Sequence, residues 1–142
     1  MVDVSGKEVS ARTATASARV DVSAEVVRLL RDGELPKGDA LGVARIAGIT
    51  AAKRTPDLIP LCHPIALHGV TVDLEVTDSA VVISATARTA DRTGVEMEAL
   101  TAAAVAGLAV IDMVKGVDPA ARIAEVLVQE KTGGTHGDWR RS

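Results

Sequence analysis

Two charged residues near the end of a long apolar segment are the strongest candidates for chemistry. Asp112 and Lys115 are three positions apart, so on a helix they share one face and can form an ion pair. The simplest interpretation is a helix-end pair that contributes about 0.3–0.5 kcal/mol. Thirteen uncharged residues precede Asp112, however, and we expect a buried site there, where an ion pair is expensive to keep. A desolvated lysine in that place would have a lowered pKa and could transfer protons near neutral pH.

Two other lysines stand where an anion could bind. Lys37 lies in the loop P-K-G-D just before a predicted helix, where Gly38 and the free amides of the helix start would suit a phosphate. A solvated loop lysine is the simpler interpretation of that position. Lys131 is followed by Thr-Gly-Gly, and consecutive glycines can form an anion-binding nest. A flexible tail fits the same residues equally well.

Two carboxylates open the long apolar segment. Glu96 and Glu98 are two residues apart, so on a helix they point about 200° away from each other. They therefore do not form a pair of acids acting on one bond. Glu96 could simply close a capping box with Thr93, whereas Glu98, one step from the uncharged run, lacks such an explanation.

A histidine between two prolines is the fourth candidate. His63 lies in the rigid frame from Pro60 to Pro64, which suits acid–base work or substrate binding, although a structural loop histidine is the alternative. Its neighbour Cys62 is the only cysteine, so the chain has no internal disulfide. The spacing of Cys62 and the three histidines does not match a zinc site, and we predict no metal.

The elements that position these residues follow from hydrophobic periodicity. The central one is a helix within Thr93–Gly116, which is apolar on every face and is therefore expected to be buried. Small side chains along it would let another helix or sheet approach closely. The segment 54–64 contains three prolines and is predicted to be neither helix nor central strand. The other predicted elements are strands at 7–22, 68–77, 80–88 and 122–130 and helices at 24–32 and 39–53.

This order, β-α-α-β-β-α-β, predicts an α+β fold of the ferredoxin-like type with one extra helix: an antiparallel sheet with helices on one face. We expect one domain over 1–142, with flexible ends at 1–6 and 132–142.

Composition excludes several classes of partner. Only 1% of the residues are Phe, Trp or Tyr and the net charge is −3, which argues against a nucleic-acid-binding protein. The uncharged run of thirteen residues is too short to span a membrane, and no signal peptide is apparent. The sequence therefore predicts a cytoplasmic protein that contacts neither nucleic acid nor membrane.

Several motifs, taken together, resemble those of the cyclic pyranopterin monophosphate synthase family of molybdenum cofactor biosynthesis. The resemblance covers nearly the whole chain. The most specific motifs are D-L-I-P-L-C-H-P and T-G-V-E-M-E-A-L-T-A, and the others are K-G-D, A-R-I-A-G-I, A-A-K-R-T, D-M-V-K and K-T-G-G.

The resemblance implies a lyase that converts the cyclised dihydro-GTP intermediate to cyclic pyranopterin monophosphate and releases pyrophosphate. It implies a homohexamer, a trimer of dimers, with sites at the dimer interface. No resident cofactor is expected, although magnesium could accompany the triphosphate. A ferredoxin-like regulatory module that binds a nucleotide without turnover is the alternative.

The resemblance also assigns roles to single residues. The catalytic aspartate of the family falls on Asp112, and its essential lysines fall on Lys37 and Lys115. Glu96 and Lys131 would support them. The remaining substrate contacts of the family fall on Leu61, Cys62, His63, Met97 and Glu98.

Overall fold

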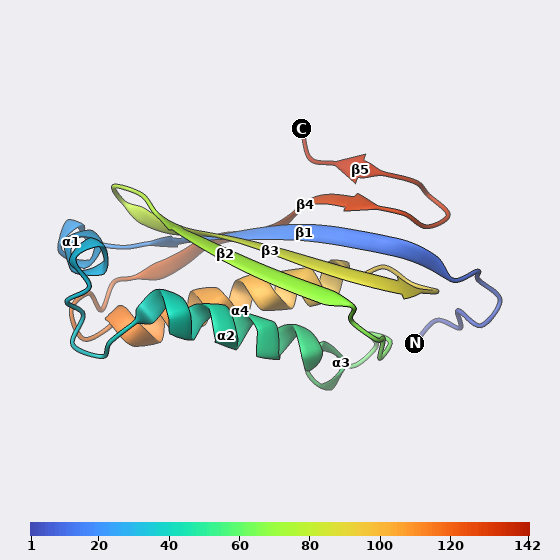
Figure 1. Cartoon of the computed structure of the whole chain (residues 1–142), viewed down its shortest axis with the longest axis horizontal. Helices are drawn as coiled ribbons and strands as arrows, with labels where there is room; N and C mark the ends of the chain where they lie inside the picture. The colour runs from blue at the N-terminus through green and yellow to red at the C-terminus, as the bar shows by residue number, and fades with distance from the viewer.

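The computed structural model describes residues 1–142, in which an antiparallel sheet lies over a layer of two helices (Figure 1). The sheet order is β2-β3-β1-β4-β5. The four strands β2-β3-β1-β4 have the order and directions of a ferredoxin-like sheet, so the predicted fold class is confirmed. The strands are β1 (Ser10–Asp21), β2 (Gly69–Val76), β3 (Ala80–Asp91), β4 (Arg122–Thr132) and β5 (Trp139–Arg140).

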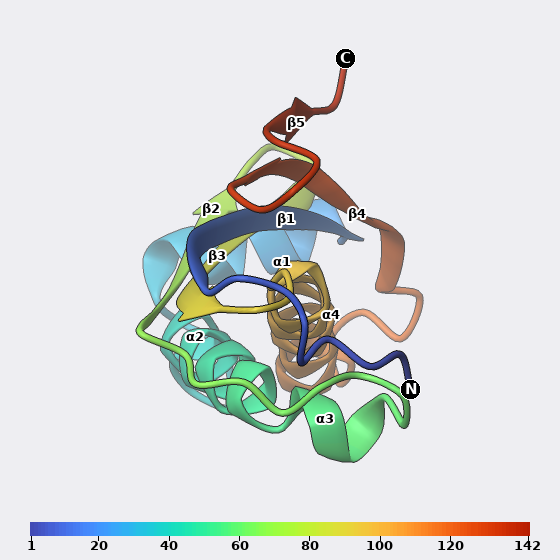
Figure 2. The same ribbon diagram turned by 90° about the vertical axis from the view of Figure 1, so that its right-hand side faces the viewer.

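Helices α2 (Ala40–Lys53) and α4 (Glu96–Val114) lie side by side beneath the sheet (Figure 2). Small side chains make this close contact possible. A Cβ added at Gly48 of α2 would lie 2.9 Å from the carbonyl oxygen of Ala102 in α4. The core between the layers is lined by fully buried alanines of β1, β3 and α4: Ala14, Ala16, Ala18, Ala85, Ala87, Ala99, Ala102, Ala103 and Ala106.

Helix α4 is not buried on every face, so that prediction is wrong. Leu108, in its middle, is 56% exposed, because the sheet and α2 cover only part of the helix surface. By length and composition alone, α4 is long and apolar enough to cross a membrane, with a mean hydropathy of 1.7. This apolar segment is longer than the uncharged run of thirteen residues. Half of that apolar window is nevertheless buried inside the domain, which is the behaviour of a core helix.

The predicted capping box at the start of α4 is also wrong. The helix begins at Glu96 with Val95 as its N-cap, and no side chain caps it. Thr93 is therefore too far before the helix, and the Glu96 carboxylate lies 3.2 Å from Lys131 Nζ instead.

The proline-rich segment contains one short helix, α3 (Thr55–Leu58), where none was predicted. Pro56 is tolerated because it lies in the first turn, where its missing amide has no helical partner to lose. Thr55 ties α3 to the end of α2 by donating its hydroxyl to the carbonyls of Ala51 and Ala52, at 3.2 and 3.0 Å.

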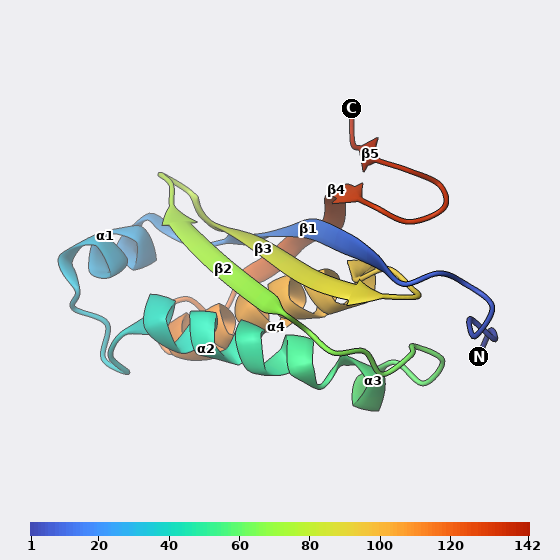
Figure 3. The ribbon, with the colours of Figure 1, turned by 45° about the vertical axis from the view of Figure 1, so that its right-hand side comes forward.

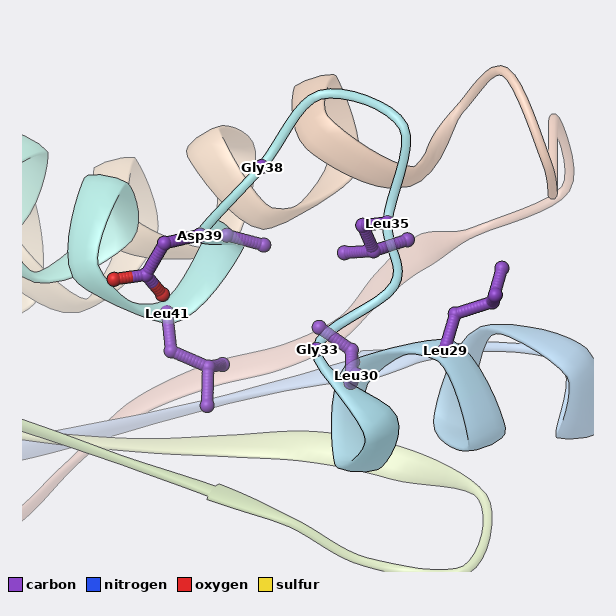
Figure 4. Close-up of a pocket in the computed structure, with 8 residues that line it drawn as sticks. Leu29, Leu30, Gly33, Leu35, Gly38, Asp39 and Leu41 are labelled. Carbon is purple, nitrogen blue, oxygen red and sulfur yellow. The ribbon is translucent and has the colours of Figure 1, made fainter.

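Helix α1 (Ala24–Asp32) has the predicted bounds and lies at one end of the sheet, from which a linker returns to α2 (Figure 3). The Ser23 side chain accepts a hydrogen bond from the backbone amide of Val26, and Gly33 ends the helix with a φ of 67°. The linker folds over a cavity of about 260 Å³ between the two helices (Figure 4). Leucines from both sides line it: Leu29, Leu30, Leu35 and Leu41.

Candidate functional site

The candidate residues form two groups at opposite ends of α4. Asp112 lies in its last turn and Glu98 in its first. At about 1.5 Å per residue, their separation of fourteen positions corresponds to about 21 Å along the helix axis. Within one chain the two groups therefore cannot contact the same reacting atom.

The lysine cluster consists of Lys37, Asp112 and Lys115. Lys115 Nζ donates to Asp112 Oδ1 at 2.7 Å, so the predicted pair forms. Lys37 comes from the linker before α2 and joins the pair. Its Nζ lies 3.5 Å from Asp112 Oδ2 and donates to the Asp112 carbonyl oxygen at 3.0 Å. The sequence gives no local sign of this contact, because Lys37 and Asp112 are 75 positions apart.

The lysine cluster is open to solvent, which corrects the expectation of a buried pair. The Lys115 side chain is 57% exposed in the chain and that of Asp112 is 59% exposed. The hydrogen bond from Lys115, and then the charges of Lys115 and Lys37, lower the pKa of Asp112. Two ammonium groups around one ionised carboxylate leave a net positive charge, which suits an anionic ligand.

The carboxylate cluster, formed by Cys62 and Glu98, lies at the other end of α4. Glu98 is only 1% exposed, and Cys62 Sγ donates to its Oε1 at 3.7 Å. The second carboxylate oxygen, Oε2, is buried without a hydrogen-bond partner. Such an atom is available to accept a hydrogen bond from a ligand.

Burial raises the pKa of Glu98, and the hydrogen bonds from its own backbone amide and from the Cys62 thiol only partly oppose this effect. Burial also raises the pKa of Cys62, and the neighbouring carboxylate adds to the effect. Cys62 is therefore held as a thiol, which is the weakly nucleophilic form.

His63 and its neighbours occupy the same end of the molecule. The Nε2 atom of His63 makes a hydrogen bond with the carbonyl oxygen of Val2, so the first residues of the chain pack against the histidine. No local sequence signal indicates this contact across 61 positions. Leu61 and Met97 are both exposed.

Lys131 and Glu96 form an ion pair with an Nζ–Oε1 distance of 3.2 Å. They line an open pocket of about 250 Å³ together with Val128 and Trp139. Trp139 was not among the sequence candidates, because its tail was expected to be flexible. No three His, Cys, Asp or Glu side chains converge closely enough to hold a metal ion.

Residues 1–134 match the model of the MoaC family. The chain belongs to the MoaC family. It is similar to proteins of the family named cyclic pyranopterin monophosphate synthase. The one from Streptomyces avermitilis is 68% identical over all of this chain and 84% of its own length. The one from Nocardioides sp. is 67% identical over 99% of this chain and 88% of its own. A Mycobacterium tuberculosis relative, cyclic pyranopterin monophosphate synthase 2, is 56% identical over 99% of this chain and 84% of its own length.

The buried carboxylate generates a pH-dependent prediction. Because the pKa of Glu98 is raised in the folded state, that state holds the proton more tightly than the unfolded chain. The free energy of unfolding should therefore fall as the pH rises from about 4.3, the unfolded pKa, through the folded pKa. Glu98→Gln cannot ionise and therefore avoids this fall in the free energy of unfolding. We expect the Tm of the variant to exceed that of the wild type by a few degrees near neutral pH. Below about pH 4 the two Tm values should differ little.

Thermal unfolding at several pH values measures this difference. Glu75→Gln, at an exposed position of β2, is the matched control and should change Tm equally little at every pH. A Glu98→Gln protein that is less stable than the wild type at neutral pH would show that ionised Glu98 is not penalised.

Proposed function

We infer that the chain is a cytoplasmic lyase of molybdenum cofactor biosynthesis. It converts 3',8-cyclo-7,8-dihydroguanosine 5'-triphosphate to cyclic pyranopterin monophosphate and releases pyrophosphate. The observation that carries this conclusion is the 64–68% identity, over nearly the whole chain, to proteins named for that product. A regulatory module without catalysis is not favoured, because the family match extends across both charged clusters.

The lysines are proposed to bind the triphosphate and to act at the phosphate. Closure of the cyclic phosphate requires a substrate hydroxyl to attack the first phosphorus while pyrophosphate leaves. Positive groups around the phosphate would stabilise the charge that develops on the leaving oxygen. Lys37 and Lys115 are assigned to this role, and Asp112 with Lys115 to proton transfer during ring opening and closure. Lys131 is assigned to substrate binding at the other end of α4, where it pairs with Glu96.

The first turn of α4 is proposed to bind the guanine-derived ring. The unpartnered Oε2 of Glu98 is suited to accept a hydrogen bond from a ring N–H. Glu96, in the same turn of α4 but on another face, supports substrate binding together with Lys131. Leu61, Cys62, His63 and Met97 complete the substrate contacts. The proposal includes no resident cofactor, and a magnesium ion carried by the triphosphate is compatible with it.

The separation of the two clusters supports a site shared between two subunits. In a two-fold dimer the start of α4 in one subunit can face the end of α4 in the other, which forms two equivalent composite sites. Three such dimers would make the hexamer that the resemblance implies. The small residues of α4 pack against their own sheet, so a partner would use exposed apolar side chains such as Ile46 and Leu108 instead.

Incubation of the protein with the cyclised intermediate tests the reaction directly. We expect stoichiometric release of pyrophosphate together with the cyclic product. A nucleotide-binding module would bind the intermediate and release no pyrophosphate, and that result would reject the lyase assignment.

Lys115→Ala should reduce kcat/KM by more than tenfold, because the variant loses more than about 1.4 kcal/mol of transition-state stabilisation. Its stability should change little, since the ion pair is exposed. The steady-state rate of pyrophosphate release and the Tm measure both effects. Lys53→Ala, another exposed lysine, is the control and should keep full activity. A Lys115→Ala protein retaining more than a tenth of wild-type kcat/KM would contradict the catalytic role.

The shared site predicts complementation between two inactive variants. Glu98→Ala and Lys115→Ala should each be inactive alone, since each damages both composite sites of its dimer. After random reassembly half of the dimers are mixed, and each mixed dimer has one intact site of two. About a quarter of the wild-type activity should therefore return. Native mass spectrometry verifies mixing, and mixed assemblies without activity would refute a shared site.

A further inference from the structure

The end of the chain folds back as a hairpin against β4. Trp139 pairs with Lys131, and Arg140 with Glu130. Two side-chain nitrogens of Arg140 donate to Glu130 Oε2 at 3.0 and 2.7 Å. The turn begins at Gly133, whose φ of 87° few other residues adopt, and its amide donates to Asp138 Oδ1 at 3.2 Å. In Figure 2, β5 stands on the side of the sheet away from α2 and α4.

This hairpin places the only Phe, Tyr or Trp ring of the chain beside two candidate site residues. Trp139 lines the pocket of about 250 Å³ with Val128, Lys131 and Glu96. Trp139 is 42% exposed, and the Arg141 guanidinium lies 5.4 Å from the centroid of its ring. A cation at that distance helps to hold the indole in place.

The pocket offers three kinds of contact to a ligand. The indole and Val128 form apolar walls, Glu96 accepts hydrogen bonds and Lys131 donates them. Its volume is below the range of about 300–1,000 Å³ that holds whole small molecules, so it would hold part of a nucleotide. The charges of Glu96 and Lys131 cancel, and the carboxylate would repel a phosphate chain. These properties fit a planar heteroaromatic ring whose edge carries both donors and acceptors.

We propose that Trp139 is a substrate-binding residue whose indole stacks on the guanine-derived ring of the substrate, with Glu96 and Lys131 at the ring edge. The proposal rests on the proposed function and adds a ring-recognition element from the C-terminal hairpin. It also places the ring at the end of α4 that holds Glu98, on the same first turn as Glu96.

Tryptophan fluorescence reports on this residue alone, because the chain has one Trp and no Tyr. The full-length wild-type protein is mixed with the cyclised intermediate, and emission and pyrophosphate release are followed in parallel. We expect the emission to change on binding, before pyrophosphate appears, and we expect inorganic triphosphate alone to leave it unchanged. Turnover without an emission change, or an equal change with triphosphate, would overturn the stacking role. An emission change without turnover would reject the proposed reaction and retain the stacked ring.

Substitutions separate stacking from support of the hairpin. Stacking of a base on an aromatic side chain contributes about 1–3 kcal/mol, so Trp139→Leu should raise KM by about 5- to 150-fold, with a smaller effect on kcat. Trp139→Phe should restore most of the affinity, because it keeps a ring. Arg140→Ala is the matched control, since it removes the bonds to Glu130 and keeps the indole, and its KM should remain near the wild-type value.

An unchanged KM in Trp139→Leu would overturn the proposal, as would an equal loss in Arg140→Ala or a failure of Phe to restore affinity. Circular dichroism and Tm verify that the variants fold. If Trp139→Leu does not fold, the fluorescence of the wild-type protein decides the question, because it requires no substitution.

Discussion

The close approach of α4 to both the sheet and α2 is the constraint on which the rest of the structure depends. Alanines on β1, β3 and α4 and the missing side chain of Gly48 set this spacing. Dense packing of small side chains replaces the aromatic residues that usually supply much of a core. Because α4 is held along its length, the groups at its two ends have defined positions.

Each end of α4 receives its partners from elsewhere in the chain. At the C-terminal end, the linker between α1 and α2 brings Lys37 to Asp112. At the N-terminal end, the segment after α3 brings Cys62 to Glu98, and β4 brings Lys131 to Glu96. The two ends differ in solvation as well as in charge. The lysine cluster is exposed and suited to phosphate, whereas Glu98 is buried and suited to a specific hydrogen bond.

Local patterns in the sequence were enough to predict the fold class, the bounds of α1 and the pairing of Asp112 with Lys115, because these depend on neighbouring residues. The errors arose where distant contacts decide the outcome. Burial of the α4 surface depends on how many elements cover it, so Leu108 could not be judged from its neighbours. The capping box is absent because α4 begins at Glu96 with Val95 as its N-cap, and the Glu96 carboxylate pairs with Lys131, 35 positions later in the chain. The ordering of Trp139 beside Lys131 likewise depends on a hairpin that glycine-rich sequence does not reveal. The assigned roles of the site residues remain predictions.

The alanine-lined core also determines how the chain can change over evolutionary time. An alanine loses almost no rotamer freedom on burial, so this core gains order at little entropic expense. It has few large side chains that could be shortened, and an added methylene on β1, β3 or α4 would have to displace a neighbouring element. At these positions, the substitutions most strongly excluded are therefore those that replace alanine with a larger side chain. Outside the two clusters and the proposed subunit interface, the exposed surface should therefore tolerate substitution much better than the spacing between the layers does.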